Sequence, residues 1–440
     1  MKYILIFFLL SNICLAQKSN KNYALVINGG HDKYSNHLRY FNNIKHNVKA
    51  YRERGIPLSN IITLYADGDL KSTNHNFSNE DEKKLFLSEA NLFSNEGFRI
   101  QGKASKENIK EYLKKLGKRI PKGGSLQLFI TDHGSDTNSG SINLWGTTIS
   151  ADELGEMLDD SIPEHVTVNL NTNICYGGSL AKLTRKNICV VANQISSSPS
   201  YSEDLGLDRW GQNFAYALKN KIDIDGDKKH SFYDAYLYAR ELKNSNNHPY
   251  NSLHYILDNA VVEPGKVKDL LLEANSKKQI YCRENQSHKQ IFSKIDMIEK
   301  INEMLDPNIH INNLLEALKR SGKDKLISKS LQFEIDKVKN SQRSMKRDLL
   351  IKEASAIKEK ILLKKKKWDS LTDDEKKIEI YKMNNDIDRL RNASGEVASK
   401  IINKERNLKQ VTKELELILA GKEEDVEKIL NARKCLSYEI

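Results

Sequence analysis

The strongest constraint on the fold is an alternation of short strand-like runs with helix-like segments between residues 23 and 193. The runs are 23–28, 61–65, 126–131, 166–171 and 188–193. Runs of this length are typical of buried strands, and their alternation with helices is typical of a parallel sheet. The sequence therefore predicts an α/β domain whose mostly parallel sheet is covered by helices on both faces.

Helix signals occupy the intervals between these runs. Apolar residues recur at helical spacing over 41–51, and a second helix is expected from 105 to 116, closed by Gly117. Residues 150–153 resemble a capping box that opens a short helix to Leu158. The polar stretch 66–104, which is rich in Asn and Ser, is interpreted as a long insertion.

The pattern changes near residue 265 to nearly continuous helix. Leu331, Ile335 and Val338 share one face, and Ile357 and Ile361 continue a similar stripe. Charged residues fill the other faces, which predicts an all-α helical bundle or coiled-coil hairpin. The expected domains are thus an α/β domain at 17–264 and a helical C-terminal domain at 265–440.

Residues 1–16 have the features of a secretory signal peptide. Lys2 precedes an apolar run from Ile4 to Leu10, and Ala16 provides a small residue for cleavage. A membrane-spanning helix needs about 20 apolar residues, and this run is too short. We therefore expect an exported protein, periplasmic or secreted, with no membrane span after cleavage.

The cysteines outside the signal peptide allow few pairings. Cys189 lies within an apolar run, where it is interpreted as a small buried hydrophobic residue. Cys282 and Cys435 bracket the helical region, and in an exported protein they are a candidate disulfide. The alternative is two unrelated free thiols. Cys175 stands at the end of a predicted strand, where it is a candidate for a functional residue and not for a disulfide.

Two predicted strands end in residues that can carry chemistry. The run 126–131 leads to His133-Gly134, and 42 residues after His133 the next run has led to Cys175. If the strands are neighbours, the two side chains share one crevice. An imidazole beside a thiol can generate the nucleophilic thiolate, and the backbone N–H groups of Gly134 and Cys175 could bind an oxyanion. The competing interpretation is a loop histidine and a core cysteine.

The segments FITDHGS, ending at Ser135, and CYGGS, starting at Cys175, resemble the legumain-like branch (C13) of the caspase-fold cysteine peptidases. The resemblance extends over roughly residues 23–260. It implies a caspase-like fold in which His133 and Cys175 form the catalytic dyad. It also implies that Asn36 orients the histidine and that Arg39 lines the pocket for the residue before the scissile bond, although the spacing of these two differs from the family pattern by one residue. A loop after the next strand supplies the rest of that pocket, with Ser200, Tyr201 and Asp204 as its candidates.

A separate acidic segment at 223–234 resembles a calcium-binding loop. Oxygen ligands at the required positions would be supplied by Asp223, Asp225, Asp227, Ser231 and Asp234. Lys228 stands where such loops have a glycine, and Asp234 is shorter than the usual glutamate. A polar turn at the start of a helix explains the segment equally well. No cofactor is required by the expected chemistry, and Ca²⁺ is the one candidate ion.

These observations favour a cysteine endopeptidase that acts on peptides or proteins. A transamidase using the same dyad and a non-catalytic binding platform are the alternatives. The net charge of +11 lies mostly after residue 264, where acidic residues are interspersed, so nucleic acid is not an expected partner despite the run Lys364–Lys367. The C-terminal helices are candidates for an inhibitory, docking or oligomerisation region.

Overall fold

The computed structural model describes residues 21–136, 140–194, 210–242, 249–261, 266–267, 307–343 and 406–439. Several predictions fall outside these residues: the signal peptide at 1–16, the pocket loop with Ser200, Tyr201 and Asp204, Cys282, Ile357, Ile361 and the lysine run. The boundary predicted between 264 and 265 also falls where residues are not described.

The main sheet has six strands in the order β2-β1-β3-β7-β8-β9. Their bounds are β1 Asn22–Asn28, β2 Ile61–Tyr65, β3 Ser125–Thr131, β7 Thr167–Asn173, β8 Ile188–Ala192 and β9 Tyr250–Asn251. The first five are parallel, and β9 is antiparallel to β8. The predicted α/β class with a mostly parallel sheet is confirmed.

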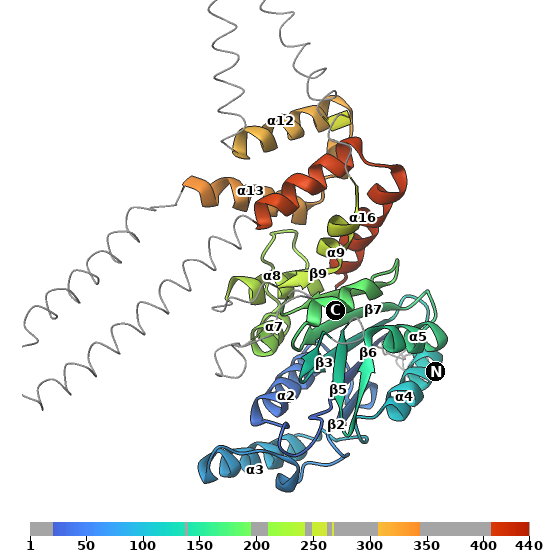
Figure 1. Cartoon of the computed structure of the whole chain (residues 1–440), viewed down its shortest axis with the longest axis vertical. Coiled ribbons are helices and arrows are strands. Elements are labelled where there is room, and N and C mark those ends of the chain that lie inside the picture. The colour runs from blue at the N-terminus through green and yellow to red at the C-terminus, as the bar shows by residue number, and fades with distance from the viewer. Residues whose placement is uncertain are drawn as a thin grey trace, which may run out of the picture.

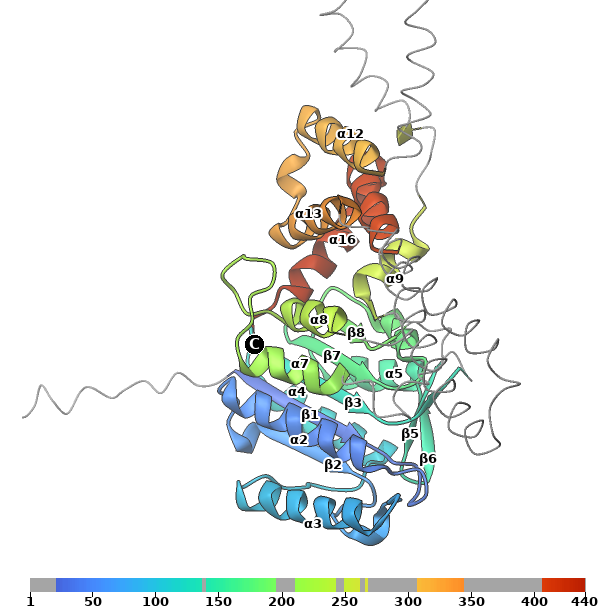
Figure 2. The ribbon, with the colours of Figure 1, turned by 90° about the vertical axis from the view of Figure 1, so that its left-hand side faces the viewer.

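Helices cover both faces of this sheet (Figures 1 and 2). One face carries α2 (Leu38–Glu53), α7 (Trp210–Lys219) and α8 (Phe232–Glu241), and the other carries α4 (Lys106–Arg119) and α5 (Ala151–Ser161). Two apolar cores result, one on each side of the strands. Alternate residues of β1 show why: Ala24 and Val26 face one core, and Leu25 and Ile27 face the other.

Two helix ends differ from the predictions. The expected stop at Gly117 is wrong, because α4 continues to Arg119. Gly117 is instead a contact point, since a Cβ there would collide with the carbonyl oxygen of Ser161. The predicted capping box at Ser150 and Glu153 is present, and α5 extends past Leu158 to Ser161.

The polar stretch 66–104 contains a helix, α3 (Glu80–Asn95), capped by the Asn79 side chain. Phe86, Ala90 and Phe93 anchor it in the core shared with α2. A second, three-stranded sheet, β4-β5-β6, follows the third strand of the main sheet. Its strands are β4 Gly134–Ser135, β5 Ser141–Leu144 and β6 Thr147–Ser150.

The C-terminal part is helical in all of its described segments. It comprises α12 (Pro307–Arg320), η5 (Asp324–Leu326), α13 (Lys329–Arg343), a helical segment at 406–420 and α16 (Glu423–Leu436). Leu331, Ile335 and Val338 are buried together, which confirms the predicted apolar face. In Figures 1 and 2 these helices lie beyond the β8–β9 side of the sheet.

The last helix joins the α/β core. Ile429, Cys435 and Leu436 of α16 are buried in the same cluster as residues of α2, α7 and α8. Cys435 forms a disulfide with Cys189 of β8, with 5.9 Å between the Cα atoms. The interpretation of Cys189 as an unbridged hydrophobic residue is therefore wrong, as is the pairing of Cys435 with Cys282. Both cysteines are buried, so the bond lies inside the core.

The remaining short elements are η1 (Leu58–Asn60), η2 (Ser72–Asn74), η4 (Gly177–Leu183) and α9 (Ser252–Asn259). Among the described residues, no helix combines the length and apolar character that a membrane crossing requires.

Candidate active site

His133 and Cys175 follow the ends of two paired strands. In the parallel register of β3 and β7, the last aligned pair is Thr131 with Asn173. Each candidate residue stands two positions beyond its strand's member of that pair. The N–H of Asp132 also donates to the Asn173 carbonyl at 3.4 Å, which extends the alignment toward the site. The two strands that the sequence suggested as neighbours do lie side by side.

Gly134 brings the two turns into backbone contact. A Cβ at this position would collide with the carbonyl oxygen of Cys175 and would lie 3.1 Å from the carbonyl oxygen of Ser141. Only a residue without a side chain allows this approach. The His133–Gly134 turn is therefore fixed directly against the segment that carries the thiol.

Cys175 is a half-buried cysteine that is not in a disulfide, and it stands at the start of a tight turn. The next residue, Tyr176, has φ +58°, a left-handed conformation that is costly for a residue with a Cβ, of order 1–3 kcal/mol. The structure after it is η4, a 3₁₀ helix of seven residues. Because its turns are few, the helix dipole at the Cys175 thiol is small.

His133 is oriented by a backbone carbonyl. Its Nε2 lies 3.2 Å from the carbonyl oxygen of Ser35. A carbonyl only accepts hydrogen bonds, so Nε2 carries the proton in the neutral ring and the basic lone pair is on Nδ1. The Tyr40 ring packs edge-on against the imidazole, with ring centroids 5.3 Å apart. Together these contacts fix both the tautomer and the plane of the ring.

Asp132 is a buried carboxyl group directly before the histidine, which the sequence prediction missed. It accepts hydrogen bonds from the backbone N–H of Gly30 and from that of His133, the latter at 2.6 Å. Burial raises the pKa of Asp132 to about 8, although these donors and Arg39 act in the opposite direction. It ties the end of β1 to the histidine turn. An acidic residue directly after a buried strand is the signal that could have revealed it.

Asn36 and Arg39, the two residues that the resemblance assigns to this histidine and to the substrate pocket, make the following contacts. Asn36 is fully buried, and its Nδ2 donates to the Asn74 carbonyl at 2.9 Å, while the carbonyl of the preceding Ser35 reaches His133. The guanidinium of Arg39 packs on the Tyr40 ring and donates to its hydroxyl at 3.0 Å. The proposed roles of Asn36 and Arg39 stay predictions. The loop with Ser200, Tyr201 and Asp204 lies outside the described residues, which resume at Trp210.

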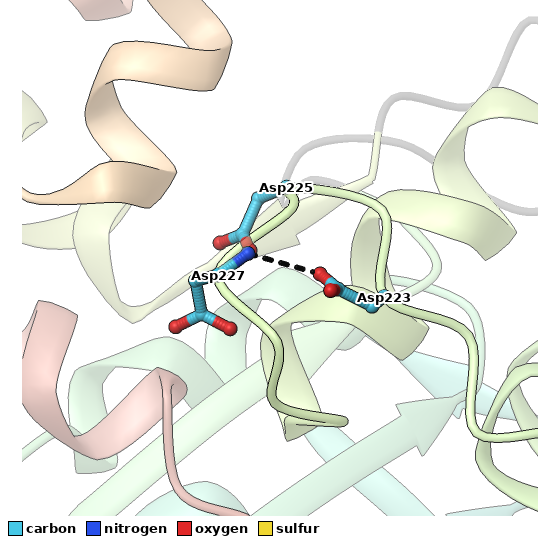
Figure 3. A group of neighbouring side chains, drawn as sticks. All are labelled: Asp223, Asp225 and Asp227. Carbon is cyan, nitrogen blue, oxygen red and sulfur yellow. Dashed lines mark hydrogen bonds between the residues drawn. The ribbon is translucent and has the colours of Figure 1, made fainter.

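The acidic segment lies apart from the dyad, between α7 and α8. Oxygen atoms of Asp223, Asp225 and Asp227 lie within 4.8 Å of one another on one turn (Figure 3). The N–H of Asp227 donates to Asp223 at 3.1 Å, and Lys228 has φ +70°, so it adopts the conformation that a glycine would favour. Burial raises the pKa of Asp225 to about 6, and the neighbouring carboxylates add to the effect.

Ser231 and Asp234 have a different task. They form the capping box of α8, in which the Ser231 hydroxyl donates to Asp234 at 2.6 Å. The other oxygen of Asp234 accepts the N–H of Ile224 at 2.9 Å. The structure therefore brings three of the five candidate ligands together and uses the other two to start a helix. These three carboxylates have the hard-oxygen chemistry that suits Ca²⁺.

No family model and no curated protein matches this sequence. Solved structures with a similar backbone include caspase-1 from Spodoptera frugiperda, at 9% identity and a TM-score of 0.30, covering 51% of this chain and 76% of that chain. A second is protein GSU0716 from Geobacter sulfurreducens, at 12% identity and a TM-score of 0.31, covering 52% of this chain and 92% of that chain. These values are too low to transfer any property of those proteins. The chain is similar to them in part, and its α/β class is established by its own strand order.

Proposed function

We propose that this chain is an exported cysteine endopeptidase in which His133 and Cys175 form the catalytic dyad. The observation that carries the proposal is the β3–β7 register, which places both residues two positions past the same aligned pair. The backbone contact of Gly134 with Cys175 and the Ser35 carbonyl at Nε2 support it. The resemblance of these two segments to legumain-like peptidases supports peptide bonds as the substrate.

The mechanism follows from the tautomer of His133. With Nε2–H donated to Ser35, Nδ1 accepts the proton of the Cys175 thiol, which leaves a thiolate beside an imidazolium. The thiolate attacks the carbonyl carbon of the scissile bond, and the charge moves to the carbonyl oxygen. Backbone N–H groups of Gly134 and Cys175 are the proposed donors to this oxyanion. The imidazolium then protonates the leaving amine, and an acyl-enzyme thioester remains.

Hydrolysis completes the cycle without a cofactor. A water molecule gives its proton to the neutral His133, attacks the thioester carbon and releases the carboxylic acid, and the thiol regains its proton. If an amine replaces water as the nucleophile, the same thioester gives a new amide. Product analysis with an added amine therefore separates hydrolysis from transamidation.

Export is proposed from the signal-like residues 1–16, and the Cys189–Cys435 disulfide fits it, because structural disulfides persist in oxidising compartments. Regulation by the C-terminal helices stays a second, separate proposal. In the described residues these helices pack on the β8 side of the sheet, where they contribute to the core.

The decisive experiment measures cleavage of a peptide library by the full-length chain and two variants. Cys175→Ser and His133→Ala should each lower kcat/KM by about a thousand-fold or more, because the thiolate cannot form or attack. His165→Ala is the matched control, since His165 is exposed just before the start of β7, at the opposite end of the strand. Its rate should equal that of the unaltered chain.

Activity that survives in Cys175→Ser would refute the mechanism. A folded chain that binds peptides and cleaves none of them would favour the binding-platform alternative instead. Circular dichroism of each variant shows whether the fold is retained.

A further inference from the structure

The carbonyl that orients His133 lies in a short loop, so its position depends on what holds that loop. The loop runs from Asp32 to Asn36. One carboxylate oxygen of Asp32 accepts the N–H groups of Tyr34 and Ser35, each at 2.9 Å. The N–H of Asn36 donates to the Asp32 carbonyl at 3.0 Å. These bonds shape the loop from within, but they do not fix it to the sheet.

Asn36 supplies two of the bonds that attach this loop to the rest of the molecule, and the Asn76 side chain adds another by donating to the Tyr34 carbonyl at 2.9 Å. The buried side chain of Asn36 donates to the Asn74 carbonyl at 2.9 Å, and its own carbonyl accepts the N–H of Asn76 at 3.0 Å. The peptide group that contains the Ser35 carbonyl is therefore one residue away from two bonds to the segment 74–76. This segment belongs to the polar insertion between β2 and α4.

Asn74 is in turn held by two carboxylates. Its Nδ2 donates to Asp67 at 2.6 Å and to Asp69 at 3.0 Å. The next residue, His75, anchors the segment in the core, because its Nε2 lies 3.1 Å from the Tyr65 hydroxyl and its ring packs 4.0 Å from that of Phe86. Burial lowers the pKa of His75 to about 4, so the anchoring ring is neutral near pH 7.

We propose that Asn74 is a positioning residue for His133, which acts through Asn36 and the Ser35 carbonyl. The inference rests on the proposed function, because positioning matters for rate only if His133 is the general base. Asn74 is suited to the task because its side-chain amide donates to two acidic residues while its backbone carbonyl accepts from Asn36. Asp67 and Asp69 together fix the rotamer of the Asn74 side chain. This in turn fixes the Asn74 backbone carbonyl, which accepts the hydrogen bond from Asn36.

Asn74→Ala tests the proposal in the full-length chain. The substitution removes the side-chain amide that donates to both Asp67 and Asp69. We expect the loop from Asp32 to Asn36 to shift as a result. A displacement of about 1 Å at a catalytic group costs about 100-fold in rate. We expect kcat to fall about 10- to 100-fold with KM changed less than about threefold. The alkaline limb of the pH–rate profile should also move to lower pH, because the imidazolium loses its carbonyl acceptor.

A role exchange provides the rescue. Asn74→Asp alone brings a third carboxylate to the pair and should be at least as slow as Asn74→Ala. Adding Asp67→Asn and Asp69→Asn restores the hydrogen bonds in the reverse direction, and most of the lost kcat should return. Asn187→Ala is the matched control, because Asn187 also donates its side-chain amide, to the Val166 carbonyl at 3.1 Å, just before the amino ends of β7 and β8. It should lower the melting temperature without changing kcat.

A purely structural role predicts that Asn74→Ala behaves like Asn187→Ala, with a lower melting temperature and unchanged kcat and pH profile. That result would overturn the proposal. A readout that needs no turnover separates this from failure of the proposed function: NMR of ¹³C-labelled histidine, with His133 assigned through His133→Gln. The His133 signal and its titration should change in Asn74→Ala and stay constant in Asn187→Ala. An unchanged His133 signal refutes the positioning role whether or not the chain cleaves peptides.

Discussion

Cys435 in α16 is bonded to Cys189 in β8 across 246 positions of the sequence. β8 is the direct neighbour of β7, the strand that leads to Cys175. A helix far along the chain is thus covalently attached beside the strand that carries the candidate nucleophile. This disulfide makes the helical part a structural component of the α/β fold.

The first prediction concerns the pairing itself. Digestion without reductant should give a peptide that links Cys189 to Cys435, with Cys282 in a different product. Replacing both bonded residues by alanine should lower stability by about 2–4 kcal/mol in denaturant unfolding, since the open chain regains entropy when unfolded. A linked peptide that contains Cys282 and Cys435 would contradict the structure.

Truncation after residue 264 should abolish folding. It removes Leu417, Ile429 and Leu436, each buried in the main core, and burial of such a side chain stabilises by about 1.5–3 kcal/mol. It also leaves Cys189 without its partner. We expect the truncated chain to aggregate, or to lose the near-UV circular dichroism signal of fixed tertiary packing. A soluble truncated form with higher activity than the full chain would instead favour removable, inhibitory helices.

A buried cluster of charged side chains from α8, α13 and α16 should make the stability of the chain sensitive to acid. Glu334 of α13 accepts from Arg240 of α8 at 3.4 Å and from Arg433 of α16 at 3.2 Å. Burial acts to raise the pKa of Glu334, but the two guanidinium groups outweigh it and lower the pKa to about 2. Arg433 also binds Glu414 through two parallel bonds, at 2.9 and 2.7 Å.

Glu334→Gln should therefore destabilise the chain by about 3–5 kcal/mol at pH 7, because Arg240 loses its buried counter-charge. The unfolded glutamate titrates near 4.5 and the folded one near 2, so this stabilisation is present above pH 4.5 and is lost as pH falls toward 2. Urea unfolding of both forms at pH 7 and pH 3 checks this, and the difference should narrow at pH 3. Glu316→Gln, which breaks an exposed pair with Arg320, is the control and should cost less than about 1 kcal/mol. An equal difference at both pH values would contradict the assignment.

Calcium titration tests the acidic turn. With three convergent carboxylates we expect weak binding, with a Kd on the order of 10⁻⁴ to 10⁻³ M by calorimetry. Asp223→Asn with Asp227→Asn should abolish it, whereas Asp81→Asn on the exposed face of α3 should not. No heat from the unaltered chain would favour the alternative interpretation, a polar turn that only opens α8.

The parallel sheet was predictable because its signals are local. The strand-like runs, the Ser150 capping box and the apolar face of Leu331, Ile335 and Val338 all depend on residues a few positions apart. The Cys189–Cys435 bond was not predictable, because its partners meet only after the whole chain between them is placed. The helix α3 was missed because its apolar contacts, such as Phe86 and Phe93, are diluted by a polar surface.

For the candidate site, the sequence predicted the two candidate side chains but not the groups that hold them in position. His133 and Cys175 stand at strand ends that any parallel pairing would bring together. The Ser35 carbonyl has no sequence signature, since every residue has a carbonyl, and the Tyr40 ring looks like an ordinary helix residue. Asp132 was visible, but its function depends on the backbone N–H of Gly30, which arrives from another strand.

The position of α16 near the end of the sequence also determines when the fold can be completed during synthesis. After Cys189 has been made, the ribosome must add 246 residues to reach Cys435, its disulfide partner. Until then one face of the sheet lacks part of its cover, and the emerging chain holds exposed apolar surface that invites chaperones and proteases. His133 and Cys175 are made early, but the core beside them is completed only when α16 has been added. Under the proposed function, this order would keep the Cys175 thiol from acting while the chain is still being made.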